Sequence, residues 1–189
     1  EVKAIIKQLN SDSSCHGIIV QLPLPKHIAA GSVLSSIDPF KDVDGLHPLN
    51  MGFLASGNPR FIPATPGGIR QMLLRTNNAP SGKHVVIIGR SDIVGRPLLQ
   101  LLSAKIEGGD ATVTLCHSLT RELPEICRLA DVIIVAIGKP NFLTGDMVSD
   151  GVVAIDVGIN RVNAPEVKRG YRLVGDIDFA TVSEKASAI

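Results

Sequence analysis

The sequence predicts an α/β protein in which a Rossmann-like domain, with a doubly wound parallel sheet, is joined to part of a smaller α/β domain. From residue 82 onward, apolar segments at 83–89, 111–118, 131–138 and 151–160 alternate with helical segments. Such alternation is typical of parallel strands joined by crossover helices. A glycine-containing turn, GRSDIVGRP, follows the first of these strands. The composition, with 44% hydrophobic and 20% charged residues, is that of a globular protein with a substantial core.

The sequence before the linking helix is predicted to form the part of the smaller α/β domain. Apolar residues at helical spacing predict a helix over 2–9, and the run Ile18, Ile19 and Val20 predicts a buried strand within 16–25. We expect a helix over 29–37 and a loop over 38–50, where Asp, Gly and Pro are frequent.

A helix over 65–77 is predicted to link the two parts. Thr65 is its candidate N-cap and Pro66 its first residue. Ile69, Met72 and Leu73 form its apolar stripe. Further helices are expected at 96–105, at 123–130 and near 145–150, and a further strand and turn at 171–179.

Composition and charge exclude several partner classes. The net charge of +1 and the aromatic content of 3% argue against nucleic acid or a membrane surface as a partner. Three widely spaced cysteines, Cys15, Cys116 and Cys127, form no C-x-x-C pair and predict reduced, mostly buried thiols without a metal. We therefore expect a cytoplasmic protein, with an organellar form left open.

The turn Gly89–Pro97 is a candidate phosphate site. It joins an apolar strand to a helix, whose first N–H groups are unpaired and lie at the positive end of the helix dipole. Its two glycines, Gly89 and Gly95, are six residues apart, so the usual G-x-G-x-x-G spacing is absent. A plain turn that binds no ligand remains the alternative interpretation.

The end of the second strand favours NADP over NAD. A carboxylate usually binds the ribose 2′-hydroxyl there, but this strand ends in Cys116, His117 and Ser118. Arg90, in the glycine turn, together with a nearby hydroxyl suits a 2′-phosphate, although it could also simply face solvent. Gly138 and Gly158 follow the third and fourth strands, where they would let a cofactor approach the backbone.

Eight motifs in order carry a resemblance to a known family. They are VQLPLP, KDVDGL, FIPATPGGI, GRSDIVGRP, ATVTLCHS, DVIIVAIGKP, IDVGIN and LVGDIDF. The set resembles the bifunctional methylenetetrahydrofolate dehydrogenase/methenyltetrahydrofolate cyclohydrolase family over nearly the whole chain. The resemblance implies NADP-dependent oxidation of 5,10-methylenetetrahydrofolate, hydrolysis of the methenyl product to 10-formyltetrahydrofolate, and a homodimer. The exposed edge of the strand within 111–118 is a candidate dimer contact.

The resemblance also implies roles for particular residues and a division of the chain. It places Gln21 and Asp44 in catalysis, with Val20 and Leu22 as further folate contacts. The cofactor contacts it implies are Gly89, Arg90, Ser91, Ser118 and Ile159. Residues 1–64 would be the C-terminal part of the catalytic domain, 65–185 the NADP-binding domain, and 186–189 the start of a return segment.

One departure from the family pattern affects catalysis. The family has a catalytic Tyr followed four residues later by a Lys, and no Tyr-x-x-x-Lys occurs in these 189 residues, whose only tyrosine is Tyr171. The chain also starts inside a predicted helix and ends, at 183–189, in what we interpret as a helix tail, so we expect it to be part of a longer protein. The scattered histidines are interpreted as surface or structural residues, with the greatest doubt at His47, close to Asp44.

Two alternatives stay open at this point. One is a non-catalytic module that binds NADP or supports dimerisation, which the missing Tyr and Lys favour. The other is a two-domain NADP dehydrogenase of the shikimate dehydrogenase type, which has no reason to carry VQLPLP and DVDGL together. Folate recognition distinguishes the enzyme from the module.

The missing lysine leads to a first prediction. General acid–base groups typically contribute about 10²–10⁴-fold to rate. The 189-residue chain alone should therefore be nearly inactive when methenyl formation is followed by absorbance. Turnover close to that of an intact bifunctional enzyme would contradict this expectation.

Overall fold

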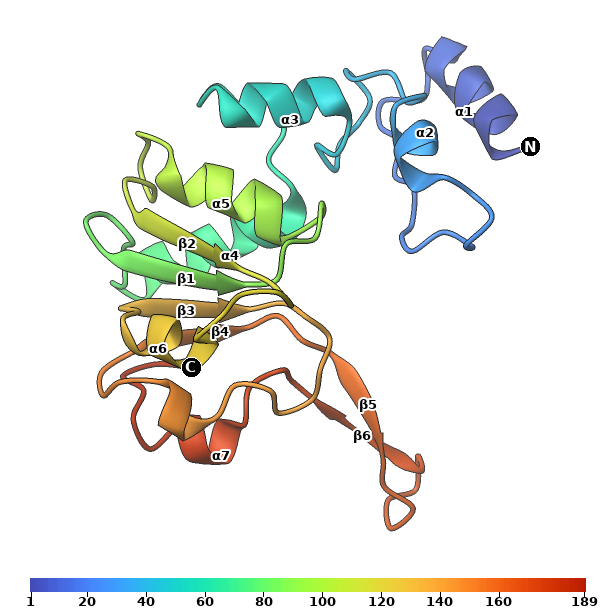
Figure 1. Ribbon diagram of the computed structural model, residues 1–189. Coiled ribbons are helices and arrows are strands. Elements are labelled where there is room, and N and C mark those ends of the chain that lie inside the picture. Colours follow the sequence, from blue (N-terminus) through green and yellow to red (C-terminus); the bar gives the residue numbers. More distant parts are fainter.

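The centre of the molecule is a parallel four-stranded sheet, and the computed structural model describes all 189 residues. Its strands are β1 (His84–Ile88), β2 (Thr112–Cys116), β3 (Val132–Val135) and β4 (Val153–Asp156). They lie in the order β2-β1-β3-β4, with helices α5 (Gly95–Ser103) and α6 (Leu123–Arg128) in the connections (Figure 1). This arrangement confirms the predicted Rossmann-like, doubly wound sheet.

Both faces of the sheet are buried, which explains why its strands are apolar along their whole length. Val85 and Ile87 of β1 face a cluster that includes Ile69 and Leu73 of helix α4 (Ala64–Arg75) and apolar residues of α5. Val86 and Ile88 alternate to the other face. There the short 3₁₀ helix η1 (Gly145–Met147), helix α7 (Phe179–Val182) and α6 contribute to the covering layer.

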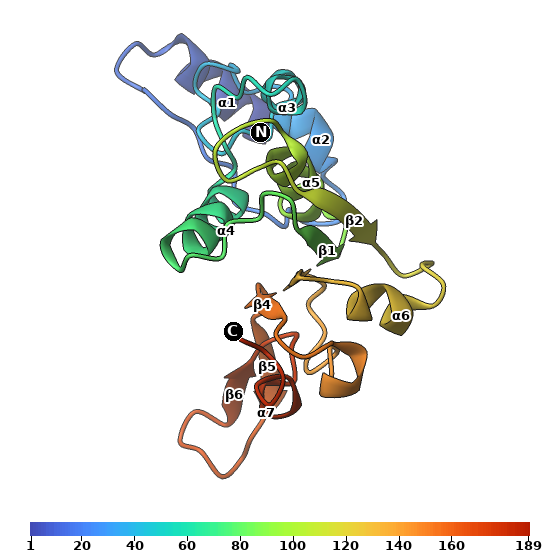
Figure 2. The same cartoon turned by 90° about the vertical axis from the view of Figure 1, so that its left-hand side faces the viewer.

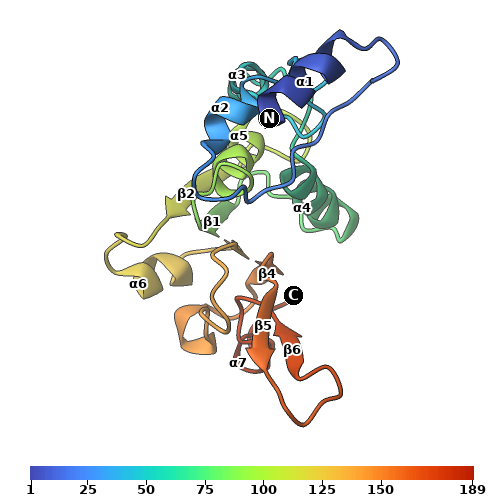
Figure 3. The same cartoon turned by 90° about the vertical axis from the view of Figure 1, so that its right-hand side faces the viewer.

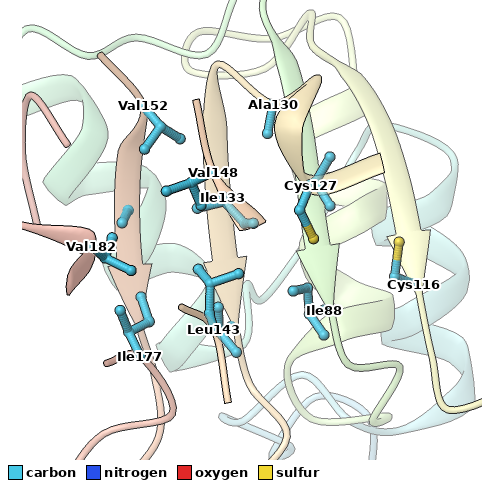
Figure 4. Packing of buried hydrophobic residues seen from close by; sticks show 13 residues of the cluster. Ile88, Cys116, Cys127, Ala130, Ile133, Leu143, Val148, Val152, Ile177 and Val182 are labelled. Atoms are coloured by element: carbon cyan, nitrogen blue, oxygen red, sulfur yellow. The ribbon is translucent and has the colours of Figure 1, made fainter. Parts of the chain in front are cut away.

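Figure 4 shows the second of these clusters. Ile88 and Ile133 project from the sheet toward Leu143, Val148 and Val182, which come from the covering segments. Each of these five side chains is at most 3% exposed. Full burial of an aliphatic side chain contributes roughly 1.5–3 kcal/mol, so this layer is a main source of stability.

Residues before α4 lie at one end of the molecule. Helices α1 (Val2–Ser11), α2 (Ala30–Leu34) and α3 (Pro48–Ala55) lie there (Figures 2 and 3). A cluster of four buried apolar side chains, Ile6, Ile18, Val33 and Ile37, includes residues of α1 and α2, and α3 adds the buried Leu54 outside this cluster. This part of the chain therefore has far less core than the sheet.

A two-stranded hairpin extends from the opposite end of the molecule. Its strands β5 (Asn160–Asn163) and β6 (Tyr171–Val174) pair antiparallel and form a sheet of their own (Figure 1). The single strand predicted over 151–160 is therefore wrong in its extent, since β4 ends at Asp156. Hydrogen bonds to the Asp156 carboxylate occupy the turn that follows, so β5 begins in a new direction.

The predicted buried strand within 16–25 is wrong. Only one isolated parallel bridge forms there, between Ile18 and Asp42, and Ile19 is 63% exposed. The bridge ends after one pair because Asp42 leads into a turn closed by Gly45, which has a φ of 68°. Pro23 and Pro25 lack the N–H groups that would extend a ladder.

Two helix predictions are also corrected. The expected loop at 38–50 contains the start of α3, because the His47 side chain caps that helix and Pro48 fits its first turn. Helix α4 begins at Ala64 with Pro63 as N-cap, so the predicted cap, Thr65, lies inside the helix. Met72 is 55% exposed and lies outside the buried stripe.

The expected helix tail at 183–189 does not form. The last helix ends at Val182, and Ala188 instead bridges Val153 in parallel orientation, next to the outer strand β4. The Ala154 N–H donates to the Ala188 carbonyl at 2.9 Å, so this segment extends the sheet. None of the helices combines the length and the apolar character needed to cross a bilayer.

Burial of the thiols leads to a second prediction. Burial raises the pKa of Cys127 to about 12, and burial also raises the pKa of Cys116. The thiolate is the reactive form, so both should resist an aromatic disulfide reagent in the folded chain, whereas the half-buried Cys15 reacts. We expect one reactive thiol before unfolding and three after it. A Cys15→Ser control should show none before unfolding, and rapid labelling of a second thiol in the native protein would contradict the burial.

Candidate functional site

Two cavities lie beside one loop. The first has a volume of about 360 Å³, and the second, at the carboxyl ends of β1, β2 and β3, has about 430 Å³. Ile93 lines the first cavity, whereas Gly89 and Arg90 line the second. The turn GRSDIVGRP therefore contributes to both cavities.

Two glycines give this turn its shape. Gly89 has a φ of 122°, and a Cβ atom there would overlap the carbonyl oxygen of Ala136 at the end of β3. A Cβ atom at Gly95 would overlap the carbonyl oxygen of Gly89. The backbone of the turn is thus packed directly on neighbouring backbone at both glycines.

Ser91 stabilises the start of α5. Its Oγ accepts the Val94 N–H at 3.2 Å and lies 3.5 Å from the Gly95 nitrogen. A hydroxyl that accepts a bond keeps its own hydrogen for donation, and Ser91 is exposed at the turn. This geometry suits an anion held at the N-terminus of α5.

Polar groups after β2 and β3 line the second cavity beside Arg90. They include His117, Ser118 and Lys139. His117 accepts the Leu119 N–H through Nδ1 at 3.2 Å, and its backbone N–H donates to Thr120 Oγ1 at 2.8 Å, so the turn after β2 is internally fixed. No carboxylate is among the lining residues, so the cavity favours an anionic ligand.

The first cavity contains the residues that the family resemblance assigns to folate. Val20, Gln21, Leu22 and Asp44 all line it, together with side chains at 63–65 and Ile93. Gln21 is exposed, and its amide donates to the Leu22 carbonyl at 3.3 Å. The structure thus brings these four residues to one concave surface.

Asp44 is a carboxylate with raised proton affinity. Partial burial raises its pKa, and the nearby Asp42 carboxylate raises it further. Asp42 itself is 1% exposed and anchors the loop, since its Oδ2 accepts the His47 N–H and the Asn50 amide, both at 2.7 Å. The sequence alone does not identify the role of Asp42. Asp42 and Asp44 lie in the same motif, and their spacing does not show which of them holds the loop and which contacts a ligand.

Two further carboxylates are not identified by the sequence patterns. Asp156 and Asp176 hold the loops after β3 and β4 through hydrogen bonds to backbone N–H groups. Their only signal in the sequence is that both lie in motifs, IDVGIN and LVGDIDF, within two residues of a glycine. Ile159, between these loops, is 79% exposed and lies outside both cavities, so its cofactor role stays a prediction.

His47 has a structural position, as interpreted from the sequence. Its Nδ1 accepts the Leu49 N–H at 3.0 Å and so caps α3. His84 is similarly occupied, with its two ring nitrogens 3.0 Å from the Leu129 carbonyl oxygen and 2.8 Å from Thr114 Oγ1.

Comparison with known proteins identifies the family. Residues 63–189 match the family model described as tetrahydrofolate dehydrogenase/cyclohydrolase, NAD(P)-binding domain, and residues 1–44 match the catalytic domain of the same family. The chain belongs to the tetrahydrofolate dehydrogenase/cyclohydrolase family. The resemblance carried by the eight motifs is therefore confirmed.

Members of this family match the chain over all or nearly all of its length. The bifunctional protein FolD 2 of Haloarcula marismortui is 52% identical over 97% of this chain and 62% of that protein. The crystal structure of the bifunctional FolD enzyme from Campylobacter jejuni is 48% identical, with a TM-score of 0.89 over 100% of this chain and 64% of that one. The Trypanosoma brucei enzyme, complexed with NADP cofactor and inhibitor, is 38% identical, with a TM-score of 0.90 over 100% and 63%. This chain spans less than two thirds of the length of these relatives.

The raised pKa of Asp44 leads to a third prediction. A folded-state pKa above the unfolded value means that stability falls as the pH rises through the folded pKa, because ionisation is costlier in the folded chain. Asp44→Asn should therefore raise the thermal midpoint at neutral pH, and the gain should vanish below the ordinary pKa of aspartate. Thermal unfolding followed by circular dichroism across this range measures it. Asp150→Asn, at an exposed carboxylate, is the matched control, and an equal gain in both variants would contradict burial beside Asp42 as the cause.

Proposed function

We propose that this chain supplies the NADP-binding domain and the folate-facing wall of a bifunctional 5,10-methylenetetrahydrofolate dehydrogenase/5,10-methenyltetrahydrofolate cyclohydrolase. The observation that carries the proposal is that one loop lines both cavities. Ile93 lines one cavity and Gly89 the other, so ligands bound in both would lie beside the same short loop and close to each other. Transfer between two bound molecules requires such proximity.

In the proposed reaction, a hydride leaves the methylene carbon of the folate for NADP, which serves as the two-electron acceptor. Water then adds to the methenyl carbon and the ring opens to 10-formyltetrahydrofolate, with release of a proton. Gln21 positions and polarises the reacting centre. Asp44 holds the pterin, because a carboxylate accepts hydrogen bonds from ring N–H and amino groups. Val20 and Leu22 are apolar contacts to the same ligand.

The cofactor residues in this proposal surround the second cavity and its entrance. Gly89 and Ser91 lie against the pyrophosphate, and Ile159 contacts the cofactor beyond the end of β4. Arg90 and Ser118, which line the cavity, bind the 2′-phosphate. An arginine and a hydroxyl are good partners for a phosphate, and the missing carboxylate after β2 removes a group that would repel it. The relative from Trypanosoma brucei, complexed with NADP, supports this choice of cofactor.

We further propose a cytoplasmic homodimer. Strand β2 is the outer strand of the sheet, so one edge of its backbone is available for contact with a second copy. A monomeric mass by light scattering at assay concentration would contradict this assembly. Within each chain, we propose residues 1–64 as part of the catalytic domain, 65–185 as the NADP-binding domain and 186–189 as the start of a return segment.

Titration of nucleotides provides a fourth prediction and tests the cofactor. By calorimetry, NADP should bind more tightly than NAD, and Arg90→Ala should weaken NADP binding about tenfold or more, as expected for loss of a charge-assisted bond. NAD affinity should change little. Arg96→Ala removes an exposed arginine from the same loop–helix segment, outside the lining of the second cavity, and should leave NADP affinity unchanged. Equal losses for NADP and NAD would contradict the 2′-phosphate role.

A second titration tests the enzyme against the two alternative functions. The NADP-loaded chain should bind 5,10-methenyltetrahydrofolate, and Asp44→Asn should weaken that binding. Binding of NADP without any folate binding would instead favour the non-catalytic nucleotide module, and binding of shikimate would favour the other dehydrogenase type.

A further inference from the structure

We propose that Asp176 is a positioning residue whose buried carboxylate fixes the wall of the nucleotide cavity and, through it, the phosphate-binding turn. This inference rests on the proposed NADP site. Asp176 has no exposed surface, and it lies in the segment that follows β6, about 40 residues further along the chain than the wall that it holds.

One carboxylate oxygen of Asp176 holds the segment after β3. Oδ2 accepts the Ile137 N–H at 2.7 Å and the Gly138 N–H at 2.9 Å. Ile137 lines the second cavity, and Lys139, which follows Gly138, lines it too. The cavity wall is therefore attached to Asp176 by two backbone bonds.

The same peptide links Asp176 to the glycine turn. A trans peptide directs its N–H and its carbonyl in opposite directions, so holding the Ile137 N–H aims the Ala136 oxygen away from Asp176. That oxygen is the atom that a Cβ at Gly89 would overlap. The position of Asp176 thus sets the surface on which the phosphate turn packs.

The other side of Asp176 is fixed by the start of the hairpin and by a second carboxylate. Its Oδ1 accepts the Asn160 amide at 2.8 Å. Asp156 Oδ1 accepts the backbone N–H of Asp176 at 2.9 Å, and Asp156 Oδ2 accepts that of Ile177 at 3.0 Å. The two carboxylates together connect the ends of β3, β4 and β6 with the start of β5.

Two glycines make room for the two carboxylates. A Cβ at Gly158 would overlap the Asp176 carboxylate, and a Cβ at Gly175 would overlap that of Asp156. A residue that replaced Asp176 without an acceptor would leave the Ile137 and Gly138 N–H groups without this partner, and the segment after β3 would lose its attachment to the buried position 176.

The hydrogen bond between Asn160 and Asp176 offers a charge-neutral test. Asn160→Asp places two carboxylates face to face, and like charges at this distance repel. Adding Asp176→Asn exchanges the partners, because the amide introduced at position 176 donates to the carboxylate introduced at position 160, while its oxygen still accepts from Ile137 and Gly138. Asn163→Asp, at an exposed position at the far end of β5, adds the same charge away from Asp176 and serves as control.

The experiment measures NADP affinity by calorimetry well below each variant's thermal midpoint, so that only folded protein is compared. We expect Asn160→Asp to weaken NADP binding about tenfold, as for a buried group left badly paired, and the exchanged double variant to return within about threefold of the starting chain. Asn163→Asp should bind as the starting chain does. The thermal midpoint is recorded in parallel, since a merely structural role would lower it without changing the affinity of the folded protein.

Each outcome has one meaning. Failure of the unaltered chain to bind NADP would overturn the proposed function itself. Normal binding by Asn160→Asp, or a double variant that binds no better than Asn160→Asp, would overturn the role of Asp176 alone. If Asn160→Asp does not fold, the double variant tests the proposal. Restored folding and NADP binding in the double variant would support the exchanged hydrogen bond, and failure to fold or bind would overturn the role of Asp176.

Discussion

The ends of β1 and β3 meet with no room for a side chain between them, and much of the molecule depends on that contact. Gly89 packs against the carbonyl oxygen of Ala136, and Gly95 packs against Gly89 in turn. Because the turn is this close to the sheet, helix α5 starts directly above the strand ends. Both cavities then form around one short loop.

The carboxylates beside the two cavities have different roles. Beside the first cavity, Asp42 uses its buried carboxylate to hold the loop, while Asp44 remains partly open to a ligand. Near the second cavity, the carboxylates of Asp156 and Asp176 accept hydrogen bonds from backbone N–H groups. The lining of that cavity itself contains cationic and hydroxyl side chains. Carboxylates therefore build both sites, but only one of these four lines a cavity.

The sheet was predictable from the sequence and the supporting carboxylates were not. An apolar run such as 85–88 specifies a strand buried on both faces, and a glycine turn after it specifies the strand-to-helix connection. The buried pairings of Asp42 and Asp176 depend on residues up to about 40 positions away, which no local pattern encodes. The segment 16–25 was mispredicted for the same reason, since a strand forms only where a partner continues beside it.

The shared loop also limits how independently the two cavities can change. A substitution that moves the backbone of 89–97 acts on both cavities at once, so selection for a new nucleotide would disturb the neighbouring surface as well. Residues 117, 118 and 120 line the second cavity alone. Substitutions that change nucleotide preference are therefore best tolerated at the end of β2. An inhibitor that contacts Ile93 would bind a segment in which few substitutions are tolerated, because each would affect both cavities.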